Sequence, residues 1–90
     1  MFAPRSTRSI YNGAMEHREL LEKHLAMAER HISEGEQHIS HQREIIARLE
    51  RAGLGGSVTA NIARELLASL ERNQALTIAE RDRILTDLSH

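Results

Sequence analysis

Histidine is the residue type in this chain with the most chemical potential, and four histidines recur every seven residues: His17, His24, His31 and His38. Residues seven apart on a helix are separated by about 10.5 Å, so no two of these four can bind the same metal ion. Helical metal ligands need spacings of three or four residues, which the sequence provides only at Glu34, His38 and His41. We expect the histidines to be solvated on a helix surface without a metal ion, and Glu34, His38 and His41 are only weak candidates for metal ligands.

The same row of histidines allows a response to pH, because imidazole gains a positive charge just below neutral pH. Two arrangements of a dimer would use the row differently. Parallel copies of the helix would place histidines beside glutamates, and antiparallel copies would place histidine beside histidine. The antiparallel case predicts weaker association in acid.

Other kinds of catalytic site find little support. The chain has no cysteine, which excludes disulfides, a thiolate nucleophile and a cysteine zinc site. The glycine-rich segment 53–56 lacks the Lys-Ser/Thr of a phosphate-binding loop, and no strand precedes it. No strand-turn-helix elbow presents a serine. We therefore predict that the protein is not an enzyme, and we expect no cofactor.

Composition also narrows the partners. Phe2 and Tyr11 are the only aromatic residues, the net charge is −1, and acids and bases alternate along the chain. Nothing resembles the basic patch and stacking platform of a nucleic-acid-binding protein. No apolar run approaches the roughly 18 residues needed to span a bilayer. We expect a cytoplasmic protein that binds neither nucleic acid nor membrane.

The element that must position the histidines is a long helix predicted over about 15–52. Apolar and small residues alternate there at spacings of four and three, as in a helix that packs along a partner helix. In heptad letters, position a holds Leu25, Ile32, Ile39 and Ile46, and position d holds Leu21, Ala28, Gly35, Gln42 and Leu49. The histidine row is position g, and position e holds Glu22, Glu29, Glu36, Arg43 and Glu50. We interpret Gly35 as a point of close helix approach.

The rest of the chain predicts a hairpin. A flexible N-terminal tail is expected over 1–13, a helical hairpin over 14–90, a glycine-rich loop over 53–58 and a second helix over about 60–88. Gly53 should end the first helix in a left-handed conformation, with Leu54 over Leu49. Ser57 or Thr59 should cap the second helix, with Thr59 preferred. The second helix should contribute Leu66, Leu70 and Ile78 to the seam, with Gln42 near Leu70 and Ala28 near Ile84.

A string of motifs resembles a group of short, uncharacterised bacterial proteins. The string is His24-Leu25-Ala26-Met27-Ala28-Glu29-Arg30-His31-Ile32, then Gly35-Glu36 with His38-Ile39, then Gln42-Arg43. A later part adds Leu66-Leu67, Ala75-Leu76 and Arg81-Asp82-Arg83. The string is similar to the pattern HLAxAExHI–GExHI–QRxxI, and the resemblance covers about residues 20–88. It implies a bacterial origin and a helical hairpin but assigns no functional residue. The loop departs from the pattern, since Leu54-Gly55-Gly56-Ser57 replaces a more polar turn.

The sequence therefore predicts an all-α, antiparallel, coiled-coil-like helical hairpin that dimerises into a four-helix bundle. Self-association is expected because apolar residues such as Leu20, Ile45, Leu67 and Leu76 remain outside a single seam, and because small domains often need association for stability. The predicted function is a non-enzymatic oligomerisation or protein-interaction module with itself and an unknown protein as partners. The alternative is a histidine-mediated metal-binding or pH-responsive protein.

Overall fold

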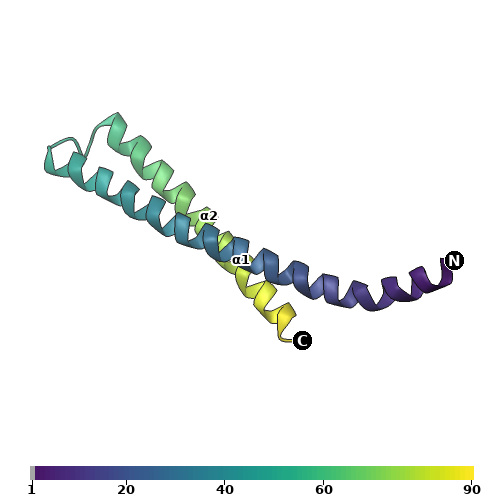
Figure 1. Ribbon diagram of the computed structural model, residues 1–90. Coiled ribbons are helices and arrows are strands. Elements are labelled where there is room, and N and C mark those ends of the chain that lie inside the picture. The colour runs from purple at the N-terminus through teal and green to yellow at the C-terminus, as the bar shows by residue number, and fades with distance from the viewer. Residues whose placement is uncertain (1) are drawn as a thin grey trace.

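The protein forms an antiparallel pair of helices in a computed structural model, which describes the backbone of residues 2–90 and the side chains of residues 16–90. Helix α1 (Phe2–Arg51) and helix α2 (Val58–Leu88) are joined by a short loop, and the described residues include no strand. The molecule is elongated, with extents of 74 × 25 × 14 Å (Figure 1). The all-α helical hairpin predicted from the sequence is thus confirmed.

The N-terminal part of α1 differs from the expected tail, because the helix begins at Phe2 rather than near residue 15. Pro4 lies in the first turn, where a helix tolerates proline since that N–H has no intrahelical partner. The side chains of residues 1–15 lie outside the described part, so the flexibility expected of residues 1–13 stays a prediction.

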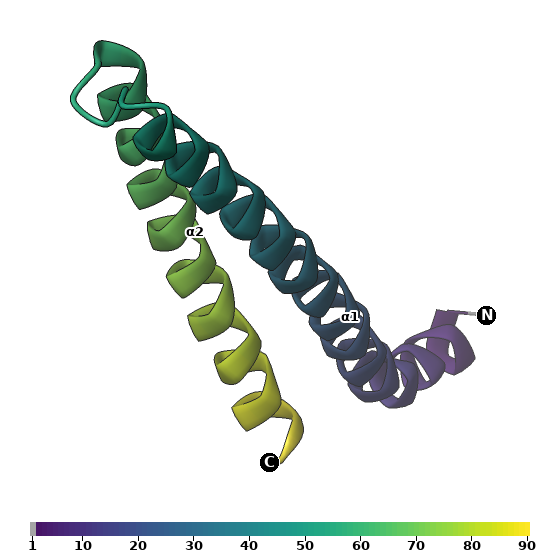
Figure 2. The same ribbon diagram turned by 90° about the vertical axis from the view of Figure 1, so that its left-hand side faces the viewer.

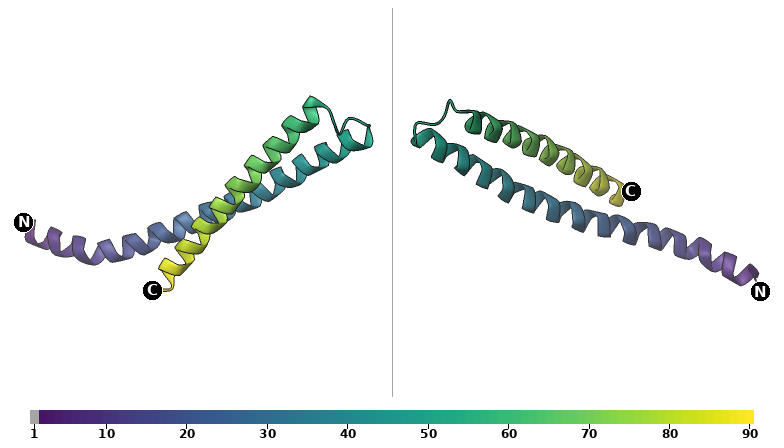
Figure 3. Two further views of the ribbon diagram at one scale, coloured as in Figure 1. Left: turned by 180° about the vertical axis from the view of Figure 1, so that it is seen from behind. Right: turned by 90° about the horizontal axis from the view of Figure 1, so that it is seen from above.

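The N-terminal part of α1 extends beyond the C-terminal end of α2. The Arg18 guanidinium donates to the carbonyl oxygen of Leu88 at 3.3 Å, which places the end of α2 at the level of Arg18. Residues 2–17 of α1 consequently extend about 24 Å beyond α2 at 1.5 Å per residue. Figure 3 shows this overhang from above, and Figure 2 shows the two helices side by side below the loop.

The end of α1 is fixed by a Schellman motif. Gly53 has φ +78°, the left-handed conformation that glycine adopts without a Cβ clash. The Leu54 N–H donates to the Leu49 carbonyl at 2.8 Å, and the Gly53 N–H donates to the Glu50 carbonyl at 3.0 Å. These two bonds define the motif, and they satisfy carbonyls that the helix end leaves free.

The start of α2 is capped by Ser57, and the preference for Thr59 was wrong. The Ala60 N–H donates to Ser57 Oγ at 3.1 Å, and Ser57 Oγ donates to the Leu54 carbonyl at 2.6 Å. Helix α2 therefore begins at Val58, so Thr59 already lies inside its first turn. Ser57 has extended backbone angles, as an N-cap requires.

The seam of α1 follows the heptad pattern. All nine a and d residues are buried or half-buried, and Ala28, Ile32, Ile39, Gln42 and Ile46 are the buried ones. In α2 one row of buried and half-buried residues recurs at spacings of three and four: Ala60, Ala63, Leu67, Leu70, Gln74, Thr77, Arg81, Ile84 and Leu88. Ile78, which was expected in the seam, lies beside this row and is half-buried. Leu66, expected in this seam, is instead 50% exposed, and its neighbour Leu67 turns inward.

Two glutamines link the helices across the seam, each to the backbone of the other helix. Gln42 Nε2 of α1 donates to the Ala63 carbonyl at 3.0 Å, and Gln74 Nε2 of α2 donates to the Ile32 carbonyl at 2.8 Å. A carbonyl oxygen has two lone pairs, so it accepts such a bond beside its helical one. The hydrogen bond of Gln42 thus goes to the backbone of α2 about two turns nearer the loop than Leu70.

Gly35 is the point of close approach in the middle of the hairpin. The Gln74 amide lies where a Cβ of residue 35 would be, and its nearest atom is Oε1. The absence of a side chain at Gly35 thus admits the amide that bonds to Ile32 one turn earlier.

Candidate functional site

The g and c positions of both helices line one side of the hairpin, which we call the histidine face. On α2, the heptad letters are assigned by placing Ala63, Leu70, Thr77 and Ile84 at position d. The face comprises His17, Leu20, His24, Met27, His31, Glu34, His38, His41, Ile45 and Arg48 on α1, and Ile62, Leu66, Ser69, Asn73, Leu76, Glu80, Arg83 and Asp87 on α2.

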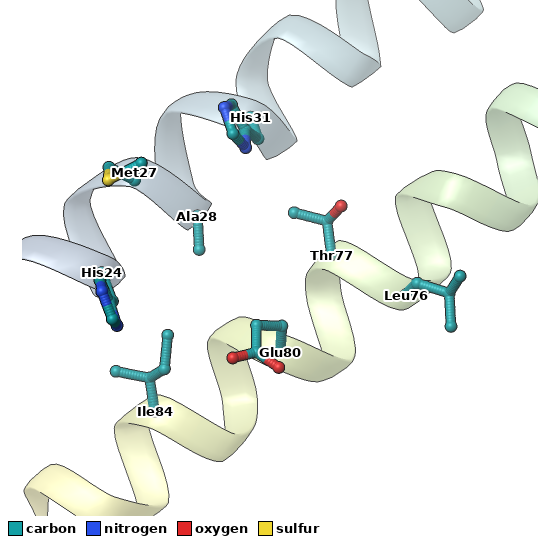
Figure 4. Close-up of a pocket in the computed structure, with 8 residues that line it drawn as sticks. All are labelled: His24, Met27, Ala28, His31, Leu76, Thr77, Glu80 and Ile84. Carbon is teal, nitrogen blue, oxygen red and sulfur yellow. The ribbon is translucent and has the colours of Figure 1, made fainter. Parts of the chain in front are cut away.

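An open groove of about 330 Å³ shows that these positions of the two helices meet on one side. His24, Met27, Ala28 and His31 line it from α1, and Leu76, Thr77, Glu80 and Ile84 line it from α2 (Figure 4). Ala28 and Ile84 point toward one another between the helices, whereas Leu76 points away. Ala28 and Ile84 thus share the groove, as the sequence predicted.

Large apolar side chains are concentrated on the histidine face. Among the described side chains, eight large apolar ones are exposed, and five of them belong to this face: Leu20, Met27, Ile62, Leu66 and Leu76. Met27 is 55% exposed and Leu76 is 70% exposed. Leu54 and Val58 lie at the loop end, and Leu85 is on the other side. Most of the exposed apolar side chains therefore lie together on one face of the hairpin rather than scattered over its surface.

The opposite side, which we call the charged face, carries the e positions and the ion pairs between helices. Arg43 Nη2 lies 2.9 Å from Glu71 Oε2, and Arg64 Nη2 lies 3.4 Å from Glu50 Oε2. All four side chains are at least 40% exposed, so each pair contributes at most about 1 kcal/mol. These pairs cover the charged face with solvated groups, and the histidine face has no such pairs between helices in the described part.

The candidate metal ligands do not form a complete site. Glu34, His38 and His41 are exposed on α1. In the region where side chains are described, no three histidine, aspartate or glutamate groups gather closely enough to hold a metal ion. Glu80 is the only carboxylate that the groove places beside His24 and His31.

Sequence reasoning missed Leu76, Thr77 and Glu80 as neighbours of the histidines. The signal that could have found them is the antiparallel pairing itself, in which g positions of one helix lie beside g positions of the other. Glu80 is such a g position. The letters could be assigned only after the inward residues of α2 were known, because its apolar pattern fits two registers.

Over the described residues, neither helix combines the length and apolar character that crossing a membrane requires. Comparison of the chain with known protein families, with curated proteins and with solved structures found no match.

Proposed function

We propose that this chain is a non-enzymatic protein-interaction module that self-associates through its histidine face. The observation that supports the proposal is the collection of exposed apolar side chains on that face and the ion pairs on the other. Burial of apolar area stabilises an interface by about 25 cal/mol per Å². A partner that covers the histidine face would therefore gain more binding free energy than one that covers the charged face.

The small core of the hairpin supports the same proposal. Seven apolar residues are buried in the described part, and three of them are alanines: Ala28, Ala60 and Ala63. Among the side chains of residues 16–90, no large one is fully buried. A core of this size rarely supplies more than about 3–5 kcal/mol, so association of hairpins would add needed stability.

Sedimentation or light scattering at micromolar concentration tests the proposal. We expect a mass near twice the 10.2 kDa of one chain. Leu76→Glu should shift the protein toward monomer, because it places a charge within the covered apolar surface. Leu85→Glu is the matched control, since Leu85 is exposed on the charged face, and it should leave the mass unchanged. A fully helical wild-type monomer of 10.2 kDa at these concentrations would contradict the proposal.

A second candidate function is a histidine-mediated response to metal or pH, which is favoured by five histidines on one face. Calorimetric titration with Zn²⁺ tests the metal version. Binding with a fixed stoichiometry that His38→Gln and His41→Gln abolish would support it. Absence of heat above the dilution background would reject it and leave the interaction module.

A further inference from the structure

The histidine face has its middle at about the same height along α1 and along α2. This arrangement allows an approximate two-fold axis that runs across both helices. Gln74 lies against Gly35, and Glu71 reaches Arg43. Residue numbers at one level of an antiparallel pair have a constant sum, so residue 36 of α1 lies opposite residue 73 by the first contact and residue 78 by the second. A two-fold axis that crosses the hairpin here would relate both helices to their copies at once.

On α1, rotation about this axis pairs residues whose numbers add to 72, and it brings each c position to a g position of the copy. Met27 then meets Ile45, Leu20 meets Ala52, and Glu34 meets His38. Apolar residues face apolar residues at both ends of the interface, and a carboxylate faces an imidazole near its centre. The apolar groups and the Glu34–His38 pair are therefore self-complementary in this antiparallel arrangement, whereas His31 meets His41 and His24 meets Arg48.

On α2, the same rotation pairs residues whose numbers add to 142. Leu66, which is 50% exposed, meets Leu76, which is 70% exposed. Ser69 meets Asn73, a pair that can exchange a hydrogen bond, and Ile62, which is 60% exposed, meets Glu80. The pattern centres on residue 71, which lies two residues from the level that the contact of Gln74 with Gly35 sets opposite residue 36.

A two-fold axis parallel to the helices fits the residues less well. It would lay α1 on α2 of the copy with residues at equal levels. Met27 would then face Glu80 and Arg83, and Leu76 would face His31 and Glu34. Exposed apolar groups would lie against charged or polar groups, so the crosswise axis is favoured.

The area of the face is sufficient for a stable dimer. Residues 20–52 of α1 span about 50 Å, and two packed helices are about 20 Å wide. The resulting surface of about 1,000 Å² exceeds the roughly 800 Å² that a standard interface buries on each partner.

We propose that a second copy of this chain docks on the histidine face in the antiparallel orientation, with Met27 against Ile45 and Leu66 against Leu76 of the copy. This inference rests on the self-association proposed above and specifies its geometry. The product is a four-helix bundle in which each helix contacts its own copy and the two loops lie at opposite ends.

Cysteine cross-linking tests the geometry, because the natural chain has no cysteine. The double variant Met27→Cys/Ile45→Cys is treated with a short bismaleimide, and we expect a covalent dimer in denaturing electrophoresis. Positions 27 and 45 are about 27 Å apart along one helix, so neither a link within one chain nor a link between like positions competes. A mixture of the two single variants should also give dimer, and each single variant alone should not.

The outcomes separate this inference from the proposed function. A wild-type dimer in sedimentation without the 27–45 link overturns the docking geometry and leaves self-association standing. Cross-linking of Met27→Cys alone overturns the geometry, because it brings like positions of the two copies together. A monomer at every concentration overturns both proposals. The pair Leu66→Cys and Leu76→Cys repeats the test on α2, so a variant that fails to fold at one site does not decide the result.

Discussion

Gln74 and Gly35 show how single residues fix the pairing of the helices. A glutamine side chain buried between two helices needs a hydrogen-bond partner, because a lost bond there costs about 1–3 kcal/mol. Gln74 reaches the Ile32 carbonyl only because Gly35 has no Cβ. Gln42, which is 8% exposed, uses the Ala63 carbonyl in the same way. The two amides resist sliding of one helix along the other.

Substitution of Gly35 should reveal this coupling. Gly35→Ala gains about 1 kcal/mol of helix propensity but displaces the Gln74 amide, a loss of similar size. We expect little net change in the native background and a stabilisation of about 1 kcal/mol in Gln74→Ala. Gly35→Leu should destabilise by about 1–3 kcal/mol through overpacking.

Urea unfolding of the four proteins of this cycle, at one protein concentration, gives the measurement. Equal effects of Gly35→Ala in both backgrounds would mean that Gln74 and Gly35 act independently. A raised melting temperature for Gly35→Leu would show that Gly35 is only a weak point in helix propensity.

At the scale of the elements, the loop is defined by its two ends. Gly53 ends α1 with a Schellman motif that the sequence predicted correctly, because Gly at C′ with Leu at C″ is specific to that motif. The cap of α2 was harder to predict. Ser57 and Thr59 are both good N-caps, and only the course of the loop from Gly55 to Ser57 selects between them.

Removal of the Ser57 hydroxyl should therefore destabilise the protein more than removal of the Thr59 hydroxyl. We expect Ser57→Ala to cost about 1 kcal/mol, because the Ala60 N–H loses its acceptor. Thr59→Ala should change the free energy of unfolding by less than about 0.5 kcal/mol, as for an exposed helical site. Ser57→Asp, which keeps an acceptor, should retain most of the stability in thermal unfolding. A larger loss for Thr59→Ala would contradict the assigned cap.

The register of α2 shows where prediction from the sequence ends. The heptads of α1 are regular, so its seam could be derived from spacing alone. In α2, Leu66 and Leu67 are adjacent, and a choice between them rotates the inward side by about 100°. Ala60 and Ala63, small enough for close approach, favour the register with Leu67 inward, and this register also provides the carbonyl for Gln42. Such a reciprocal fit involves both helices and is invisible in either alone.

At the scale of the whole molecule, five histidines share one face with two arginines and three carboxylates. The five are His17, His24, His31, His38 and His41. With neutral imidazoles this face has a net charge of −1, and a proton on each of the five would bring it to +4. Glu80 lies beside His24 and His31, and Glu34 faces His38 of the copy, which compensates only part of this charge.

In the antiparallel dimer two such faces lie against each other, with His31 opposite His41 and His24 opposite Arg48. We therefore expect weaker association at pH 5.5 than at pH 8, measured by sedimentation at low salt. Each exposed contact contributes at most about 1 kcal/mol, so the shift depends on several histidines together. The variant His31→Gln/His41→Gln should reduce the difference between the two pH values, and 1 M salt, which screens charges beyond about 3 Å, should also reduce it. A dimer that is unchanged or tighter in acid would reject the antiparallel contact of the histidine faces.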